Sequence, residues 1–139
     1  MREILFRGKR TDNGEWVEGS LIIWQDGSCS IETGKLDTPM LSVIRDSICQ
    51  FTGLTDKNDK KIWEGDIVRT QPFSDRPYSK RAKFKQHIGV VEHKIYPNYI
   101  SEWFVSIDDY DGFGCCNWSA FYQCEVIGNI HDNPELTDN

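Results

Sequence analysis

The segment 51–68 constrains the fold of this chain more than any other part of the sequence. It reads FTGLTDKNDKKIWEGDIV. Turn-forming residues separate its short apolar runs: Gly53, Asn58 and Asp59. Directly after Trp63, the tripeptide Glu64-Gly65-Asp66 is typical of a kink at which a strand enters a small barrel. The segment therefore predicts short, closely spaced β-strands, and it carries no catalytic pattern.

Three strands are predicted in the first 32 residues. Residues 4–6 form the first, and the sequence TDNG at 11–14 is a hairpin turn, because Asn and Gly tolerate positive φ. Residues 15–24 return as the second strand. Residues 28–32 alternate small or apolar with polar side chains, as a half-buried strand does. The N-terminal part is thus expected to be a β-hairpin extended into a small sheet.

The rest of the chain predicts further strands around one long loop. Residues 40–51 fit either a helical turn near 44–48 or another short strand, and their periodicity does not separate the two. Residues 71–86 contain two prolines and no regular pattern, so they form a loop longer than a compact domain usually carries. Strand patterns return at 88–96, 102–108 and 122–130.

These elements indicate a mainly β fold with little helix. The expected architecture is a small, partly open SH3-like β-barrel together with the N-terminal sheet lobe. The length of 139 residues suits a single compact domain. Two β lobes, 1–50 and 51–131, are the alternative arrangement, and the polar tail 132–139 is expected to fray.

Two parts of the sequence are similar to each other. TDNGEWVEG at 11–19 resembles TDKN at 55–58 followed by WEGD at 63–66, and each reads as a turn, a tryptophan strand and a Glu-Gly kink. A duplication would make each copy the nucleus of one β lobe. Hairpin chemistry alone could also have produced the likeness, and the sequence leaves both explanations open.

The same motifs resemble those of the YopX family, small proteins encoded by bacteriophages and prophages. The resemblance extends from RGK at 7–9 and WVEG at 16–19, through TGLTDKN at 52–58 and EGDIV at 64–68, to VIGNI at 126–130 and NPEL at 133–136. Asp59 departs from it, because the family usually has glycine after the asparagine. The resemblance implies a phage or prophage protein in the cytoplasm of a bacterial host. The residues of this chain that form the structural part of the resembling motifs are Trp16, Gly19, Gly53, Trp63, Glu64, Gly65 and Asp66.

Composition excludes several classes of protein. With 38% hydrophobic residues the chain can bury a core, and no apolar run approaches the roughly 20 residues of a membrane span. Five cysteines without regular spacing, and no secretion signal, favour a reduced cytoplasm over a disulfide framework. The net charge of −6 argues against tight, unspecific binding to nucleic acid.

Metal binding and catalysis have weak support. Cys115, Cys116 and Cys124 with His131 contain zinc-ligand types, but adjacent cysteines rarely chelate one tetrahedral metal. The carboxylates of Asp108, Asp109 and Asp111 are typical of a turn between strands. His87 and His93 are not accompanied by any nucleophile or metal motif. We expect no catalytic residue, no metal site, no cofactor and no enzymatic activity.

One basic and aromatic patch stands out against the acidic background. Residues 69–85 carry six basic residues and a single acidic one, with aromatic residues interleaved. A second candidate is Trp118, which lies in an apolar loop with two glycines. The candidate partner-binding residues are Arg76, Tyr78, Lys80, Arg81, Lys83, Phe84, Lys85 and Trp118. They indicate an interaction module that binds a protein partner or itself as an oligomer; the alternative is an accessory factor that binds nucleic acid through 69–85.

Overall fold

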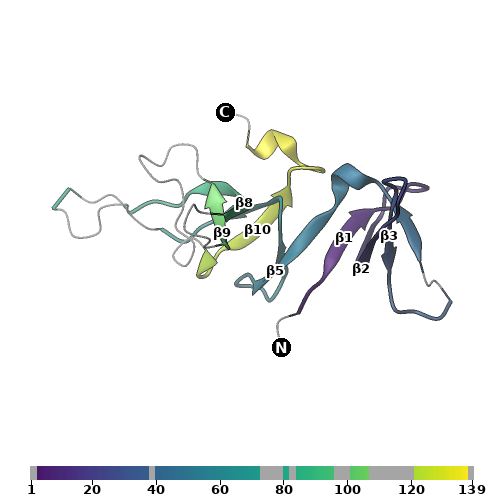
Figure 1. The fold of residues 1–139 in the computed structure, drawn as a ribbon. Coiled ribbons are helices and arrows are strands. Elements are labelled where there is room, and N and C mark those ends of the chain that lie inside the picture. Colours follow the sequence, from purple (N-terminus) through teal and green to yellow (C-terminus); the bar gives the residue numbers. More distant parts are fainter. Residues whose placement is uncertain are drawn as a thin grey trace. The chain divides into compact units, whose positions relative to one another are not determined.

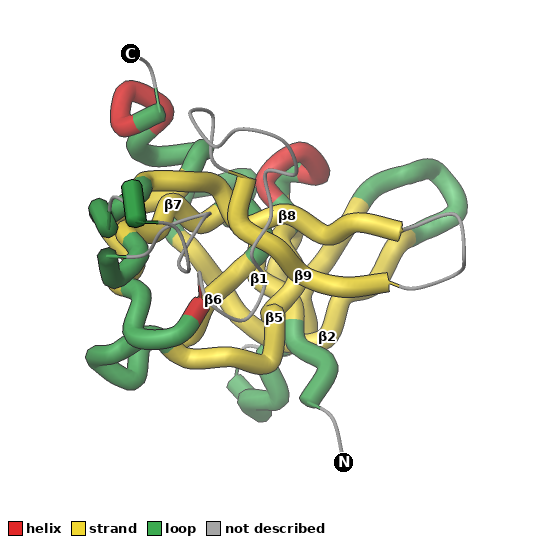
Figure 2. The backbone as a smooth tube through the Cα atoms, turned by 90° about the vertical axis from the view of Figure 1, so that its left-hand side faces the viewer, coloured by secondary structure: helices red, strands yellow, loops and turns green. Residues whose placement is uncertain are grey.

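The computed structural model describes residues 3–37, 40–72, 80–81, 84–95, 101–106 and 121–137, and strands dominate it (Figures 1 and 2). The described strands are β1 (Phe6–Lys9), β2 (Trp16–Ile23), β3 (Cys29–Glu32), β4 (Leu41–Val43), β5 (Cys49–Thr55), β6 (Lys61–Trp63), β7 (Asp66–Arg69), β8 (Ile88–Ile95), β9 (Ser101–Ser106) and β10 (Glu125–Asn129). Short 3-10 helices lie at Arg45–Ser47 (η1) and Pro134–Leu136 (η2). The prediction of a mainly β fold with little helix is confirmed.

The chain divides into two compact units, Met1–Gly53 and Leu54–Asn139. One sheet has the order β4-β3-β2-β1-β5-β6, and the boundary between the units falls inside β5. The other sheet, entirely in the second unit, has the order β10-β7-β8-β9. Neighbouring strands pair in antiparallel fashion wherever a register is defined. The described strands do not form a closed barrel, and likeness to an SH3 fold stays a prediction.

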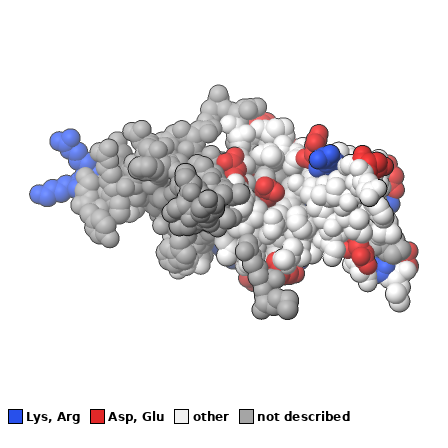
Figure 3. Space-filling model, in the orientation of Figure 1, with Lys and Arg blue, Asp and Glu red and all other residues white. Residues whose placement is uncertain are grey.

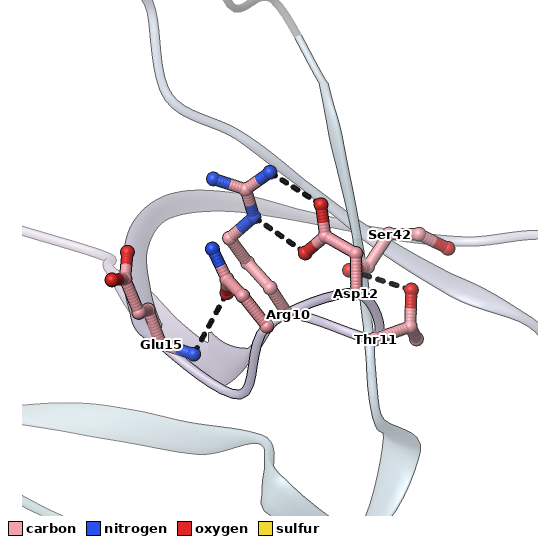
Figure 4. A network of polar contacts seen from close by, with 6 residues as sticks. Arg10, Thr11, Asp12, Glu15 and Ser42 are labelled. Atoms are coloured by element: carbon pink, nitrogen blue, oxygen red, sulfur yellow. Dashed lines mark hydrogen bonds and ion pairs between the residues drawn. The ribbon is translucent and has the colours of Figure 1, made fainter.

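The first hairpin forms around the predicted turn 11–14, but its first strand is Phe6–Lys9, later in the chain than the predicted strand 4–6. β1 and β2 pair from Phe6 with Gly19 to Lys9 with Trp16, and the turn is closed by bonds between Arg10 and Glu15 and between Gly14 and Arg10. Gly14 has a φ of +74°, which its missing Cβ permits. The guanidinium of Arg10 donates two hydrogen bonds, of 2.9 and 2.6 Å, to the carboxylate of Asp12 (Figure 4). Local turn chemistry therefore determines this hairpin.

The first sheet curls so that β4 also meets the end of β1. The N–H of Thr11 donates to the Ser42 carbonyl, and that of Ile44 donates to the Lys9 carbonyl at 2.8 Å. Between them, Arg10 and Val43 form a β-bridge. A small core of Cys29, Ile31 and Val43 fills the concave side, with Phe6, Val17, Leu21 and Ile48 packed around it.

Segment 40–51 uses both of the structures that its sequence left open. β4 is followed by η1 and then by β5. The hydroxyl of Ser47 explains the break, since it donates to the Ile44 carbonyl at 2.6 Å and accepts from the Lys9 N–H at 2.8 Å. This buried serine closes the short helix and attaches it to β1.

The second unit has its own core. The buried set is Ile62, Val68, Val91, Trp103, Val105, Phe121 and Cys124, with Val126 packed against it. The strand predictions at 88–96, 102–108 and 122–130 correspond to β8, β9 and β10. This sheet supports the long connection between β7 and β8.

The two echoed Glu-Gly pairs differ in structure. Gly65 has a φ of +84° in the turn between β6 and β7. Gly19 instead lies inside β2, where no turn separates strands. The two pairs thus occupy different positions, one in a turn and one inside a strand, where Gly19 serves a close approach of β3. A kink of the strand at Glu18-Gly19 stays a prediction.

Candidate functional site

Asp56, in segment 51–68, forms a hydrogen bond with the last strand, β10. Its buried carboxylate accepts hydrogen bonds from the backbone N–H groups of Asn58 (2.8 Å), Lys60 (2.9 Å) and Val126 (2.9 Å). Burial raises the pKa of this carboxyl, but the three donated hydrogen bonds outweigh it and hold the pKa below its ordinary value. Asp56 is thus a structural acceptor, ionised at neutral pH.

A second carboxylate fixes the Glu-Gly-Asp turn. Asp66 is almost completely buried and accepts from the Trp63 N–H at 2.8 Å. Gly65 donates to the Val91 carbonyl at 2.8 Å and accepts from the Ile130 N–H at 2.9 Å. Trp63 itself is buried. Local hydrogen bonds and burial therefore hold Trp63, Gly65 and Asp66 in place.

Asp59 adopts a left-handed backbone conformation, which favours the glycine that the YopX-like pattern usually has at this position. Its φ is +62°, in the left-handed region that costs residues with a Cβ about 1 kcal/mol or more. We expect Asp59→Gly to raise the free energy of unfolding by about 0.5–1 kcal/mol, measured by urea denaturation. Lys60→Gly, next in the chain and without a positive φ, should lower it. A less stable Asp59→Gly variant would contradict the argument.

The tail expected to fray at 132–139 contains an organised turn as far as residue 137. The side-chain oxygen of Asn129 accepts from the N–H groups of His131 and Asp132, both at 2.9 Å. Asn133 donates from its backbone to the Asn129 carbonyl at 2.8 Å, directly before η2. These bonds fix the start of the tail against β10.

The long connection, residues 71–86 (below, the basic connection), starts from a fixed base. Thr70 and His87 pair across it: the Thr70 N–H donates to the His87 carbonyl at 2.8 Å, and the His87 N–H donates to Oγ1 of Thr70 at 2.9 Å. Both residues are buried. The connection therefore leaves a rigid part of the β7–β8 ladder.

A row of paired residues crosses the sheet β10-β7-β8-β9 next to Thr70 and His87. Ile88 pairs with Arg69, and Arg69 pairs with Glu125, so that three strands contribute one residue each. The Glu125 carboxylate lies 3.6 Å from Arg69 and 3.4 Å from Lys57. One carboxylate thus faces two cations, and Lys57, which lies outside the row, gives the group of charges its net positive sign. Sequence patterns did not indicate Lys57, Ile88 or Glu125, because the strand register brings them together.

The described part of the basic connection is exposed. Lys80, Arg81 and Lys85 are exposed cations, and Phe84 exposes 59% of its surface. Figure 3 shows Lys and Arg side chains in blue at its left edge. The other predicted contact residues lie outside the described residues: Arg76, Tyr78, Lys83 and Trp118.

Two tryptophans of the first unit show opposite environments. Trp16 is half-buried, with the guanidinium of Arg7 4.4 Å and the ammonium of Lys9 5.3 Å from the ring centre. Such cation–π contacts make its ring part of the packing between β1 and β2. Trp24 is exposed, and its indole N–H donates to Oγ of Ser30 at 3.1 Å.

The residues considered for catalysis or metal binding give no assembled site in the described part of the chain. Burial, together with the nearby Asp56 carboxylate, raises the pKa of the Cys124 thiol to about 11, so this cysteine stays protonated and unreactive at neutral pH. His93 lies against Trp103, their rings 4.8 Å apart. Cys115, Cys116 and the Asp108–Asp111 carboxylates lie outside the described residues, among which no metal-ligating group of three occurs.

Among the described residues, no helix has the length and apolar character that a membrane span requires.

Comparisons with known proteins link nearly the whole chain to one family. A family model described as "YopX protein" matches residues 5–138. The fold is similar to that in "Crystal structure of protein EF1440 from Enterococcus faecalis", with 26% sequence identity, a TM-score of 0.52, and coverage of 98% of this chain and 99% of that one. The comparison with curated proteins found no match. Neither description that did match names an activity, a ligand or a partner.

Proposed function

The chain belongs to the YopX family, and on that premise we propose that it is a non-enzymatic interaction module that binds a protein partner through the basic connection. The resemblance noted in the sequence adds a phage or prophage origin and the cytoplasm of a bacterial host to this proposal. The observation that supports it best is the exposed Phe84 among the cations Lys80, Arg81 and Lys85.

The base of this surface favours binding without a change of fold. Because Thr70 and His87 close the ladder, contacts made by the connection act on a fixed sheet. The adjoining row adds the half-exposed apolar side chain of Ile88 and the cation of Arg69. Exposed aromatic and aliphatic side chains that lie close in sequence to several cations are suited to a protein surface that carries both apolar and acidic groups.

Binding of nucleic acid is the second candidate, favoured by the same cations. Lys80, Arg81 and Lys85 could neutralise phosphates while Phe84 stacks on a base. The net charge of −6 weighs against this candidate, since the remainder of the protein would repel the phosphate backbone. A protein partner is therefore the preferred candidate.

Site-specific photo-cross-linking tests the proposal. A benzophenone amino acid at position 84, introduced in the bacterial cytoplasm, is expected to give discrete protein adducts that disappear when Arg81 and Lys85 are changed to Glu. The same probe at Leu36, an equally apolar and fully exposed position of the first unit, serves as the control. Identical adducts at both positions, or none at 84, would refute the proposed surface. Adducts to DNA or RNA alone would transfer the assignment to nucleic acid.

A further inference from the structure

We propose that Asn13 is a site of spontaneous modification, at which the protein converts its own asparagine to aspartate and isoaspartate, and that the hairpin turn at 11–14 controls the rate. This inference is independent of the basic connection, because Asn13 and Gly14 lie in the first unit. Three observations support it: the residue that follows Asn13, the exposure of the turn, and the hydrogen bonds of the two groups that react.

Asn13 is the only asparagine of the chain that is followed by glycine. The backbone nitrogen of the residue after an asparagine can attack the amide carbon of the asparagine side chain, and a side chain on that next residue obstructs the attack. Gly14 has no Cβ and leaves the approach open. Both residues are exposed, so solvent reaches them. Sequence and exposure together therefore single out Asn13 for this reaction.

The reaction needs no reactant besides the chain and water. The amide of Gly14 loses its proton to solvent base, and its nitrogen bonds to Cγ of Asn13. The bond from Cγ to Nδ2 breaks, and ammonia leaves with a proton returned by the solvent. Water then opens the resulting succinimide ring at either carbonyl, which leaves aspartate or isoaspartate at position 13. Each product adds one negative charge to a chain whose net charge is −6.

In the folded hairpin both reacting groups are engaged in other bonds. The Gly14 N–H donates to the Arg10 carbonyl at 3.0 Å, so the proton that must be lost is held between two residues. The side-chain oxygen of Asn13 accepts from the Glu15 N–H at 2.9 Å, which fixes the orientation of the carbon under attack. The hydrogen bonds from Arg10 to Asp12 also stabilise the turn (Figure 4). Ring closure therefore requires the turn to open, and the native rate measures that opening.

The two products affect the hairpin differently. Aspartate keeps an oxygen in place of the amide oxygen of Asn13, so the hydrogen bond from the Glu15 N–H is retained. Isoaspartate carries the backbone through the former side chain and lengthens the turn by one carbon. The bond between the Arg10 N–H and the Glu15 carbonyl, which closes the turn at 2.9 Å, then no longer fits. Isoaspartate is therefore the product that weakens the pairing of β1 with β2.

Peptide mass spectrometry of the full-length protein, incubated at mildly alkaline pH in buffer and in guanidinium chloride, tests the inference. Electron-transfer fragmentation distinguishes aspartate from isoaspartate. In denaturant Asn13 is expected to react faster than any other asparagine, and in buffer at least about tenfold more slowly than in denaturant. Asp12→Ala, which removes the contact with Arg10, should accelerate the reaction in buffer and leave the rate in denaturant unchanged. Equal rates in the two solutions, or an unmodified Asn13 in denaturant, would overturn the inference.

Asn58 provides the matched control. It is exposed in a turn, and the next N–H, that of Asp59, donates to the Asp56 carbonyl at 3.0 Å. Asp59 has a Cβ, so Asn58 should react slowly even in denaturant, and Asp59→Gly should bring its rate there close to that of Asn13. Gly14→Ala should make the converse change and slow the reaction of Asn13. An Asn58 that reacts as fast as Asn13 in the wild type would refute the role given to the following residue.

Discussion

Replacing Gly19 with alanine is expected to lower the free energy of unfolding by about 3 kcal/mol or more. A Cβ at this position would lie 2.0 Å from the carbonyl oxygen of Glu32 and 3.0 Å from the side chain of Ile31. The obstacle is backbone in the β2–β3 ladder, where Ser20 pairs with Glu32, so it cannot move without breaking the register. Urea denaturation followed by far-ultraviolet circular dichroism measures the loss.

Gly14→Ala provides the matched control for this prediction. Gly14 has a positive φ but no atom near a new Cβ, so its replacement adds backbone strain of about 1 kcal/mol and no collision. Gly8→Ala, whose Cβ would meet Val43 at 3.0 Å, should fall between the two because that side chain can shift. If Gly19→Ala cost no more than Gly14→Ala, β3 could not approach β2 as closely as described.

Changing Asp56 to alanine is expected to cost about 3–5 kcal/mol of stability, because three backbone N–H groups lose their acceptor at once. One of the three belongs to Val126, 70 residues away, so the change also releases β10 from the 56–60 turn. Asp56→Asn keeps one acceptor oxygen and should lose less. A cost below about 1 kcal/mol for Asp56→Ala, measured by the same denaturation, would show that water replaces the carboxylate.

The pH dependence of stability gives a second readout for Asp56. Its pKa is lower in the folded protein than the ordinary value of 3.8, so the folded state favours the ionised form. The stabilisation is complete well above pH 3.8 and is lost as the pH falls through the folded pKa. Subtracting the stability of Asp56→Asn from that of the wild type isolates this group from the other carboxyls. The difference should shrink on acidification below about pH 4; a difference independent of pH would contradict it.

Local chemistry explains why part of the fold could be predicted. Asn13-Gly14 specifies its own turn. The alternation of small or apolar with polar side chains in 28–32 indicates a strand without reference to the rest of the chain. Gly53 and Asp59 likewise mark positions of positive φ within a few residues of sequence. Features of this kind depend on backbone preferences that each segment carries with it, so a single sequence is sufficient to find them.

The remaining features depend on residues far apart in the chain. The partner of Asp56 on β10 and the collision that forbids a Cβ at Gly19 arise only after strands have chosen their register. The row of Ile88, Arg69 and Glu125 has the same origin. Sequence composition indicated the cations of the basic connection. It could not identify Glu125 as the residue that forms ion pairs with Arg69 and Lys57.

The bonds between Thr70 and His87 let the sheet and the basic connection change independently. They close the ladder before the connection begins, and the register of β7 with β8 uses residues outside 71–86. Doubling the length of a flexible loop costs only about 0.6 kcal/mol in closure entropy. Insertions and substitutions in 71–86 are accordingly expected to cost the pairing of β7 with β8 little stability.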